Sequence, residues 1–316
     1  MSDVIDLDHA SWLEASARVR VTGLLDEGSF AEFLGPELRE MSPHLPLFDL
    51  PRAFDDGVVV GRGRLDGRDV FIAAQEGRFM GGTFAEVAGA KIVGLLRAAR
   101  AKADANADAK FERNAGVVLL LLDTGGVRLQ EANAGELAVS EIIRAIAEAR
   151  RAGIAVIALV GGKAGAFGGG GIITACCSRI AISQYGRTSV SGPEVIETNK
   201  GVEEFDSKDR ALVWRITGGR TRILSGGADR YVRDDIAAFR AGAIALASEA
   251  LPAFDLARLQ AEQKRLGRRL AEHGACRDAT EMWAQSGIEE PGGISDLTED
   301  AFMALDAKRG APDDAR

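Results

Sequence analysis

Two apolar runs, each followed at once by glycines, constrain the fold of this chain more than any other feature. The first runs from Val117 to Leu122 and leads into DTGG, and the second runs from Ile154 to Val160 and leads into GGKAGAFGGGG. Neither run alternates as a solvent-facing strand does, so both are expected to be strands covered on both faces of a parallel sheet. Residues 133–151 between them have helical apolar spacing, so the order strand, helix, strand predicts a βαβ crossover.

Patterns before this unit predict a hairpin and a helix. The apolar runs at 57–63 and 68–75 are separated by a short polar segment that ends in Gly67, which is typical of a hairpin. Apolar residues recur at helical spacing from 88 to 99, and Thr83 with Glu86 three positions later indicates an N-cap and capping box.

Patterns after the second glycine run predict a helix from near Ile172, a short strand at 179–183 and a loop at 189–197. From about Ser207 the pattern becomes helical, chiefly over 231–249 and 254–272. The central sheet is therefore expected to be complete before that point.

The expected organisation has three parts: an N-terminal arm over 1–50, a core domain over 51–206, and a helical region over 207–316 for packing and subunit contact. Apolar residues mark one side of the last long helix, and basic residues mark another. The apolar set is Leu256, Leu259, Leu266 and Leu270, and the basic set is Lys264, Arg265, Arg268 and Arg269. The basic side has two interpretations, a solvated charged face or a contact for a phosphate-bearing ligand or partner.

Composition excludes several classes of function. The formal net charge of −8 offers no global attraction to nucleic acid or to anionic membranes, and the longest aliphatic runs are far too short to span a bilayer. No secretory signal is visible, so a cytoplasmic location is expected. The cysteines Cys176, Cys177 and Cys276 form no C-x-x-C pair and the three histidines are scattered, so no metal site is expected.

The glycines after the two strands are the candidate catalytic groups. Gly125 and Gly126 follow one strand, and Gly168, Gly169 and Gly170 precede the expected helix. Without a Cβ, backbone N–H groups can approach an oxygen that becomes negatively charged, and a helix N-terminus adds its positive dipole end. The alternative is that these glycines only make tight turns. The run is neither a Walker loop nor a dinucleotide fingerprint, because the G-K-[ST] ending and the matching downstream acid are both missing.

Three segments resemble the carboxyltransferase branch of the crotonase-like superfamily: GVVVGRGRLDGRDVFIAAQEGRFMGG, LLDTGGVRLQEA and the stretch that ends in SGPEVIETN. This resemblance spans residues 57 to 199 and implies an α/β fold with a crotonase-like ββα spiral core. The segments DTGGVRLQEANAGE, GAFGGGGIITACCSRI and SGPEVIETNKGVEEFDS more closely resemble the β subunits of biotin-independent malonate decarboxylases. The carboxyltransferase β subunit of acetyl-CoA carboxylase is also similar, but it carries a four-cysteine zinc ribbon whose cysteines are missing here.

The resemblance implies a carbon–carbon lyase that decarboxylates malonyl-S-acyl carrier protein through a thioester enolate held in an oxyanion hole. It implies two partners, a γ subunit that supplies the other half of the site and an acyl carrier subunit with a CoA-like phosphoribosyl-dephospho-CoA arm. No metal, biotin, nucleic acid or membrane is implied. Two alternatives stay open: the carboxyltransferase subunit of a biotin-dependent acyl-CoA carboxylase or decarboxylase, and a non-catalytic scaffold subunit.

The resemblance also nominates substrate-binding residues. Those that match the loop lining the pantetheine channel are Phe79, Met80, Gly81 and Gly82. Arg128, Gln130 and Glu131 match the family's R-x-Q-E pattern, where the arginine either holds a carboxylate or, with the glutamate, pins the start of a helix. Ser191, Gly192 and Glu194 match an active-site loop.

Overall fold

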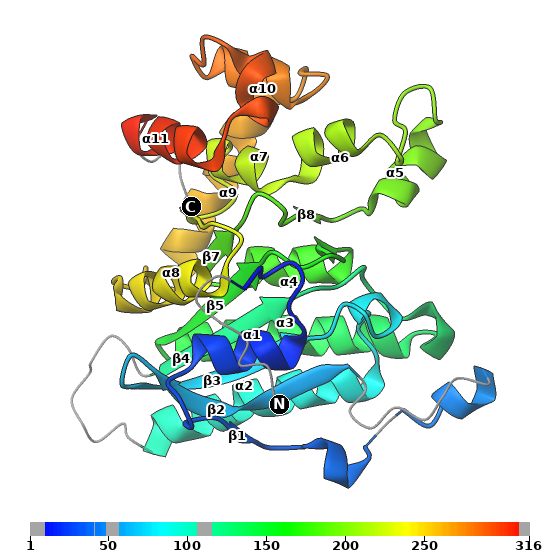
Figure 1. Ribbon diagram of the computed structural model, residues 1–316, viewed down its shortest axis with the longest axis vertical. Coiled ribbons are helices and arrows are strands. Elements are labelled where there is room, and N and C mark those ends of the chain that lie inside the picture. The colour runs from blue at the N-terminus through cyan, green and yellow to red at the C-terminus, as the bar shows by residue number, and fades with distance from the viewer. Residues whose placement is uncertain (1–9, 41, 49–56, 106–115, 310–316) are drawn as a thin grey trace, which may run out of the picture.

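A seven-stranded sheet with the strand order β1-β2-β3-β4-β5-β7-β9 lies at the centre of the molecule (Figure 1). The computed structural model describes residues 10–40, 42–48, 57–105 and 116–309. The strands of this sheet are β1 (Ala31–Glu32), β2 (Val58–Leu65), β3 (Arg68–Gln75), β4 (Gly116–Leu122), β5 (Ile154–Val160), β7 (Arg179–Ile182) and β9 (Arg230–Tyr231). The pairs β1/β2 and β2/β3 are antiparallel, and every pair from β3 to β9 is parallel. A second parallel pair joins β6 (Ala166–Phe167) to β8 (Thr188–Ser189).

Helices cover both faces of the sheet and continue into a C-terminal tier (Figure 1). They are α1 (Ala17–Leu24), α2 (Glu86–Ala105), α3 (Ala134–Arg151), α4 (Gly169–Cys176), α5 (Pro193–Lys200), α6 (Arg210–Thr217), α7 (Gly219–Leu224), α8 (Ile236–Ser248), α9 (Leu256–His273), α10 (Ala279–Gln285) and α11 (Glu299–Arg309). Short 3₁₀ turns are η2 (Pro36–Leu38), η3 (Leu45–Phe48), η4 (Met80–Gly82), η5 (Leu129–Glu131) and η6 (Pro291–Asp296). None of the helices in the described ranges is long and apolar enough to cross a membrane.

The core has two layers, one on each side of the sheet. Alternate residues of β4 belong to opposite layers, with Leu120 in the layer that includes α2 and α3, and Leu119 in the layer that includes α1 and α8. Trp12, just before α1, stacks on Phe239 of α8 with ring centroids 3.9 Å apart. The core therefore draws on the predicted N-terminal arm and C-terminal region as well as on residues 51–206.

Several predicted elements are confirmed. The two β2/β3 strands meet at Asp66 and Gly67, whose φ values of 53° and 74° fit a two-residue primed turn. The predicted helix over 133–151 is α3, and Gly153 follows it with a φ of 77°. The predicted strands at 117–122 and 154–160 are β4 and β5, paired in parallel along their length.

Four local predictions were wrong. Thr83 does not cap the next helix, because its hydroxyl donates to the carbonyl of Met80 at 2.9 Å and α2 begins only at Glu86. The helix expected from Ile172 begins three residues earlier, because Gly168, with a φ of 56°, already serves as its N-cap.

The other two corrections concern residues 189–197 and 231–249. The first stretch contains α5, which begins at Pro193, a residue well suited to a helix's first turn. In the second, Tyr231 belongs to β9, which extends the parallel sheet beyond β7, and the helix begins only after Asp235 caps it. The sheet is therefore not complete before residue 207.

Candidate active site

The loops that follow β3 and β4 are joined through their backbones. The N–H of Gly125 donates to the carbonyl of Gly81 at 2.9 Å, and the N–H of Phe84 donates to the carbonyl of Gly126 at 2.8 Å. These bonds bring together two glycine pairs that the sequence separates by more than 40 positions. The predicted substrate loop and the first predicted catalytic loop are one structural unit.

The loop that follows β5 joins the same unit. The N–H of Thr124 donates to the carbonyl of Gly165 at 2.7 Å, and the N–H of Phe167 returns a bond to the carbonyl of Thr124 at 3.0 Å. A Cβ built on Gly168 would lie 3.3 Å from the Cα of Gly126, so the two glycine clusters are in contact. Three parallel strands thus deliver their following loops to one place, as the βαβ arrangement predicts.

The glycine run at the start of α4 lets this helix approach its neighbours closely. A Cβ on Gly169 would come within 2.4 Å of Val139, and one on Gly170 within 2.4 Å of the methyl group of Thr124. Both residues lie in the first turn, whose N–H groups have no acceptor within the helix. The positive end of α4 is therefore pressed against the β4 loop.

The N–H groups of the two glycine clusters differ in whether they already have hydrogen-bond acceptors within the protein. In the β4 loop, Gly125 donates to Gly81, and Gly126 donates to the hydroxyl of Thr124 at 3.1 Å. Both donors predicted from the DTGG segment thus already have acceptors, one in the β3 loop and one in the β4 loop. The first turn of α4, whose N–H groups have no acceptor within the helix, stays the predicted donor site.

The loop of Phe79, Met80, Gly81 and Gly82 has an uncommon backbone. Met80, Gly81 and Gly82 all have positive φ values, of 49°, 67° and 64°. A Cβ on Gly82 would lie 1.7 Å from the carbonyl oxygen of Asp123, so no other residue fits there. Only Met80 is strained there, because glycines adopt positive φ readily. A strained residue of this kind persists only where its surroundings fix it, and such residues are concentrated at ligand-binding and active sites.

Arg128 lies in a buried ion pair with Glu131. Its side chain is 1% exposed, its Nη1 donates to Glu131 at 3.0 Å, and its guanidinium lies over the ring of Phe79. The other carboxylate oxygen of Glu131 accepts the N–H of Glu86 at 3.0 Å, at the first residue of α2. This geometry matches the second interpretation of the R-x-Q-E pattern, in which the pair fixes the start of a helix.

The remaining nominated residues lie at the edge of the site. Gln130 is exposed, and Gly192 is the N-cap of α5, with Ser191 before it and Glu194 exposed in its first turn. These residues follow Ser189, which pairs with Phe167 of the β5 loop in the β6/β8 sheet. Their part in substrate binding stays a prediction.

Asp123 is a structural residue of the site that sequence reasoning missed. One carboxylate oxygen accepts from Arg20 of α1 at 2.9 Å, and the other accepts the N–H of Ala164 at 2.7 Å. The aspartate therefore links the β4 and β5 loops to the N-terminal helix. The sequence signal was its place directly after a buried strand, whereas nothing local identified Arg20 as the partner.

Arg187 is a second residue that sequence reasoning missed. Its guanidinium lies 4.5 Å from the ring centre of Trp214 and 5.5 Å from that of Phe167, and it donates to the carbonyl of Lys163. Burial lowers the pKa of Arg187 from its ordinary value. The arginine thus holds the Gly-rich loop against α6.

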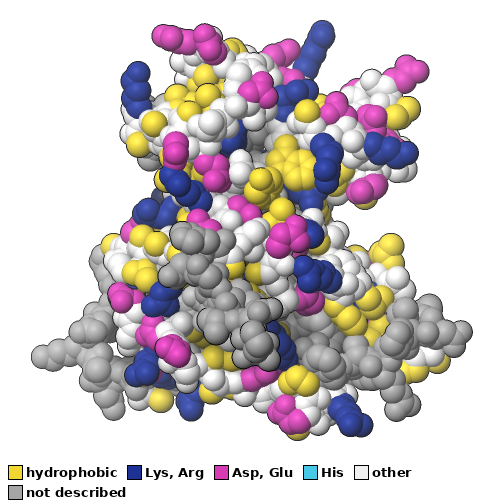
Figure 2. Space-filling model, viewed as in Figure 1, with side chains coloured by type: hydrophobic (Ala, Val, Ile, Leu, Met, Phe, Trp, Pro, Cys, Tyr) yellow, Lys and Arg dark blue, Asp and Glu magenta, His cyan; other side chains and the backbone are white. Residues whose placement is uncertain are grey.

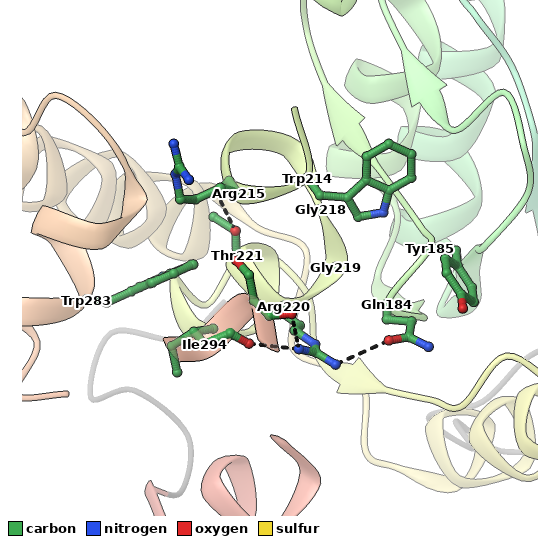
Figure 3. Close-up of a pocket in the computed structure, with 11 residues that line it drawn as sticks. Gln184, Tyr185, Trp214, Arg215, Gly218, Gly219, Arg220, Thr221, Trp283 and Ile294 are labelled. Carbon is green, nitrogen blue, oxygen red and sulfur yellow. Dashed lines mark hydrogen bonds between the residues drawn. The ribbon is translucent and has the colours of Figure 1, made fainter. Parts of the chain in front are cut away.

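A cavity of about 100 Å³ lies between α6, α7 and the C-terminal helices (Figure 3). Arg220 closes one side of it by donating to the carbonyls of Ile294 and Leu297 at 2.7 Å each, and to Gln184 at 3.2 Å. The volume is below the roughly 300–1,000 Å³ typical of ligand pockets, and none of the nominated site residues lines it. We assign it to the joint between the sheet and the C-terminal tier.

No group of three His, Cys, Asp or Glu side chains within the described ranges is placed to hold a metal ion. The face in Figure 2 carries basic and acidic side chains interspersed with one another. The described side chains of that face therefore form no large patch of a single charge sign.

The model of the carboxyl transferase domain family matches residues 14–253, from α1 to just beyond α8. The chain belongs to this family. It is 37% identical over 98% of its length to the malonyl-S-ACP:biotin-protein carboxyltransferase MADC of Malonomonas rubra, with 99% of that protein covered.

Two solved structures carry the same fold. A chain of the Pseudomonas malonate decarboxylase hetero-tetramer, solved with malonate, is 42% identical with a TM-score of 0.73, and the match covers 82% of this chain and 91% of that one. A chain of the Pseudomonas malonate decarboxylase MdcD-MdcE hetero-dimer is 37% identical with a TM-score of 0.65, over 84% and 100% of the two chains. The fold is accordingly the crotonase-like α/β fold of the carboxyltransferases and malonate decarboxylases, and the family domain includes the α1 and α8 segments that the predicted 51–206 core left out.

Proposed function

We propose that this chain is the β subunit of a malonate decarboxylase and that, with a γ subunit, it converts malonyl-S-acyl carrier protein to acetyl-S-acyl carrier protein and CO₂. The bond between the α-carbon and the carboxylate breaks, and its electron pair moves into the thioester as an enolate. A proton then adds to the α-carbon. The enzyme's task is to stabilise the enolate oxygen more than the ground-state carbonyl.

The observation that carries this proposal is the placement of the first turn of α4 against the β4 loop. Gly169 and Gly170 belong to that first turn, so their backbone N–H groups and the positive end of the helix dipole lie beside the β4 loop. One preorganised donor of this kind contributes roughly 2.7–4 kcal/mol, or about 100- to 1,000-fold in rate. Two such donors account for a large share of the acceleration that decarboxylation needs.

The proton source is proposed to lie outside this chain. Of the charged side chains of the glycine loops, Asp123, Arg128 and Glu131 are held in buried ion pairs, whereas Lys163 is exposed and its Nζ donates to Glu14 at 2.6 Å. A group in a buried pair is a poor acid or base, because changing its charge would leave its buried partner uncompensated. A γ subunit facing the loops would then complete the site, which agrees with the hetero-dimeric and hetero-tetrameric assemblies of the solved malonate decarboxylases.

The substrate arm is proposed to enter past the strained loop of Phe79, Met80, Gly81 and Gly82. The ring of Phe79 is partly exposed beside Arg128, and the loop is bonded directly to Gly125. An acyl carrier subunit with a CoA-like phosphoribosyl-dephospho-CoA arm would present the malonyl thioester here. The chain itself then needs neither metal nor biotin.

A second candidate function is transfer of the carboxyl group to a biotin-bearing protein. The 37% identity to a malonyl-S-ACP:biotin-protein carboxyltransferase over nearly the full length favours it. Both reactions pass through the same enolate and need the same donors. They differ in whether the carboxyl group leaves as CO₂ or is bonded to biotin nitrogen.

The test is reconstitution of the chain with a γ subunit and malonyl-loaded carrier protein, with CO₂ release measured with and without avidin. We expect release that needs both subunits and resists avidin. Avidin-sensitive exchange of the carboxyl group would establish the biotin-dependent alternative. A complex whose turnover survives bulky substitution at both Gly126 and Gly169 would show that the chain is only a scaffold.

A further inference from the structure

A cavity of about 310 Å³ lies between the C-terminal ends of α3 and α4 and the first turns of α9. None of the residues nominated for the active site lines it. The residues of α4 that line it, Ala175 and Cys176, are at the opposite end of that helix from Gly169 and Gly170, roughly 9 Å away along the helix axis. The cavity is therefore a separate site from the glycine loops.

The walls of this cavity are largely apolar. Ile143 and Ala147 of α3, Ala175 of α4, Phe254 and Leu259 all line it. An apolar cavity of about 150 Å³ stays dry and binds benzene, so one of twice that volume admits an aromatic ring or a short alkyl chain together with a polar head group. The volume also lies within the range of roughly 300–1,000 Å³ that is typical of ligand pockets.

The charged side chains around the cavity are in positive excess. Three arginines line it, namely Arg150, Arg179 and Arg258, and Glu262 is the only acid among the described residues that do so. Glu262 is itself bonded to Arg265, a residue of the predicted basic side of α9 that is only 8% exposed and whose Nε donates to it at 2.8 Å. The charge of the lining therefore favours an anionic ligand over a neutral or cationic one.

Two of the three arginines are already held in place by the chain. The Nη1 of Arg150 donates to the carbonyl of Cys176 at 2.6 Å, and the Arg150 guanidinium lies 4.3 Å from the ring centre of Phe254. Arg179 donates through its Nε to Glu249 at 3.3 Å. These two side chains form a fixed, positively charged wall, because their guanidinium groups are anchored on the protein itself.

Arg258 differs from the other two arginines. Its backbone N–H donates to Asp255 at 2.8 Å in the N-cap of α9, but its partly buried side chain makes no ion pair or hydrogen bond with the residues that the structure describes. A guanidinium holds a carboxylate through two parallel hydrogen bonds. One such arginine matches a single carboxylate, whereas a phosphate dianion would leave further oxygens without donors among the apolar walls.

We propose that this cavity binds a small monocarboxylate with an apolar body, which is an aromatic ring or a short alkyl chain. The carboxylate pairs with Arg258, and the apolar body lies between Ala147 and Phe254. This site goes beyond the proposed function, because it shares no residue with the glycine loops. A ligand bound there contacts α3, α4 and α9 together, and it therefore stabilises the packing of α9 on the core.

The test uses the full chain with hydrocinnamate as the probe, and titration calorimetry measures the binding. We expect saturable binding of one hydrocinnamate per chain. The uncharged analogue hydrocinnamyl alcohol should bind at least about tenfold more weakly, because it offers Arg258 no carboxylate. Acetate, which has the carboxylate but no apolar body, should not displace the probe.

Two variants locate the bound probe. Arg258→Gln should weaken hydrocinnamate binding at least about tenfold and leave binding of the alcohol unchanged. Its matched control is Arg268→Gln, the same substitution at an exposed position of α9, which should bind both compounds as the unmodified chain does. Ala147→Leu places a larger side chain in the cavity and should abolish binding of both compounds, with an unchanged Tm because the added atoms enter existing space.

The proposal is overturned if hydrocinnamate shows no saturable binding at millimolar concentrations. It is also overturned if Ala147→Leu folds normally and still binds the probe, since the probe then occupies another place. Equal affinity for the acid and the alcohol, or equal affinity of Arg258→Gln and the unmodified chain, would show that Arg258 holds no carboxylate. If Ala147→Leu does not fold, the comparison of Arg258→Gln with Arg268→Gln decides alone.

Discussion

Arg20 and Asp123, 103 positions apart, form an ion pair that is almost completely withdrawn from solvent. The Nη1 of Arg20 donates to Asp123 at 2.9 Å, and the two side chains are 3% and 4% exposed. The same arginine donates through Nε to the carbonyl of Trp12 at 2.9 Å. The N-terminal helix is thereby tied to the loop that carries Gly125 and Gly126.

Breaking this pair on one side should be costly. We expect Asp123→Asn to lower the free energy of unfolding by about 3–5 kcal/mol, because the buried charge of Arg20 loses its counter-charge. Urea unfolding at constant m-value measures the effect. The double variant Arg20→Met with Asp123→Asn removes both charges and should recover part of the loss, and a double variant no better than Asp123→Asn would contradict this account.

The sequence was informative wherever a feature is local. The apolar runs of β4 and β5, the hairpin of β2 and β3 and the glycine clusters were all predicted from neighbouring residues, and the structure brings both clusters together as expected. The hairpin turn is shorter than the segment 64–67 expected from the sequence, because Leu65 pairs with Arg68. The Arg20–Asp123 pair could not be predicted in this way, because it depends on a contact between distant segments. The two-residue strand β9 was missed since it is too short to show a period.

The hydrogen-bond acceptors inside the site could not be predicted from the sequence either. The sequence indicates that Gly125 and Gly126 can approach an oxygen, but not that Gly81 and the hydroxyl of Thr124 already accept their N–H groups. The capping of α2 shows the same limit. The spacing of Thr83 and Glu86 suggested a local capping box, whereas the acceptor comes from Glu131, 45 positions away.

Asp26 should make stability depend on acid pH. The Arg240 guanidinium, together with the N–H groups of Gly67 and Asp66, holds the pKa of Asp26 down at about 2. A carboxylate with a lowered folded-state pKa stabilises the fold above its unfolded pKa of about 3.9, and this contribution is lost as pH falls towards 2. Because the side chain is 24% exposed, we expect only about 1 kcal/mol after screening.

The measurement is the free energy of unfolding between pH 5 and pH 2 for the unmodified chain and Asp26→Asn. The unmodified chain should be more stable at pH 5, and the difference between the two should shrink as the pH approaches 2. A difference that stays constant over this range would show that the ion pair with Arg240 is not its source.

Glu131 should matter for stability and not for substrate affinity. In Glu131→Gln the side chain can still accept the N–H of Glu86, but Arg128 remains buried without a counter-charge, at a cost of about 3–5 kcal/mol. Since the pair pins the start of α2, KM for malonyl carrier protein should change little in the fraction that stays folded. The control is Glu136→Gln, which makes the same substitution at an exposed position on α3. It should change the free energy of unfolding by no more than about 0.5 kcal/mol. A large rise in KM with normal stability would instead assign Arg128 to the substrate carboxylate.

Gly170 gives the most direct test of the donors at α4. A Cβ there would come within 2.4 Å of the Thr124 methyl group, so Gly170→Ala must push the helix start away from the β4 loop while keeping its N–H. A displacement of about 1 Å at a reacting centre lowers turnover on the order of 100-fold, and we expect that loss in CO₂ release by the assembled complex. Gly94→Ala is the control, because its Cβ meets nothing within 4 Å on the exposed side of α2, and alanine there should stabilise the fold by about 0.5–1 kcal/mol. If Gly170→Ala assembles and turns over like Gly94→Ala, the N–H groups at the start of α4 are not the groups that hold the enolate.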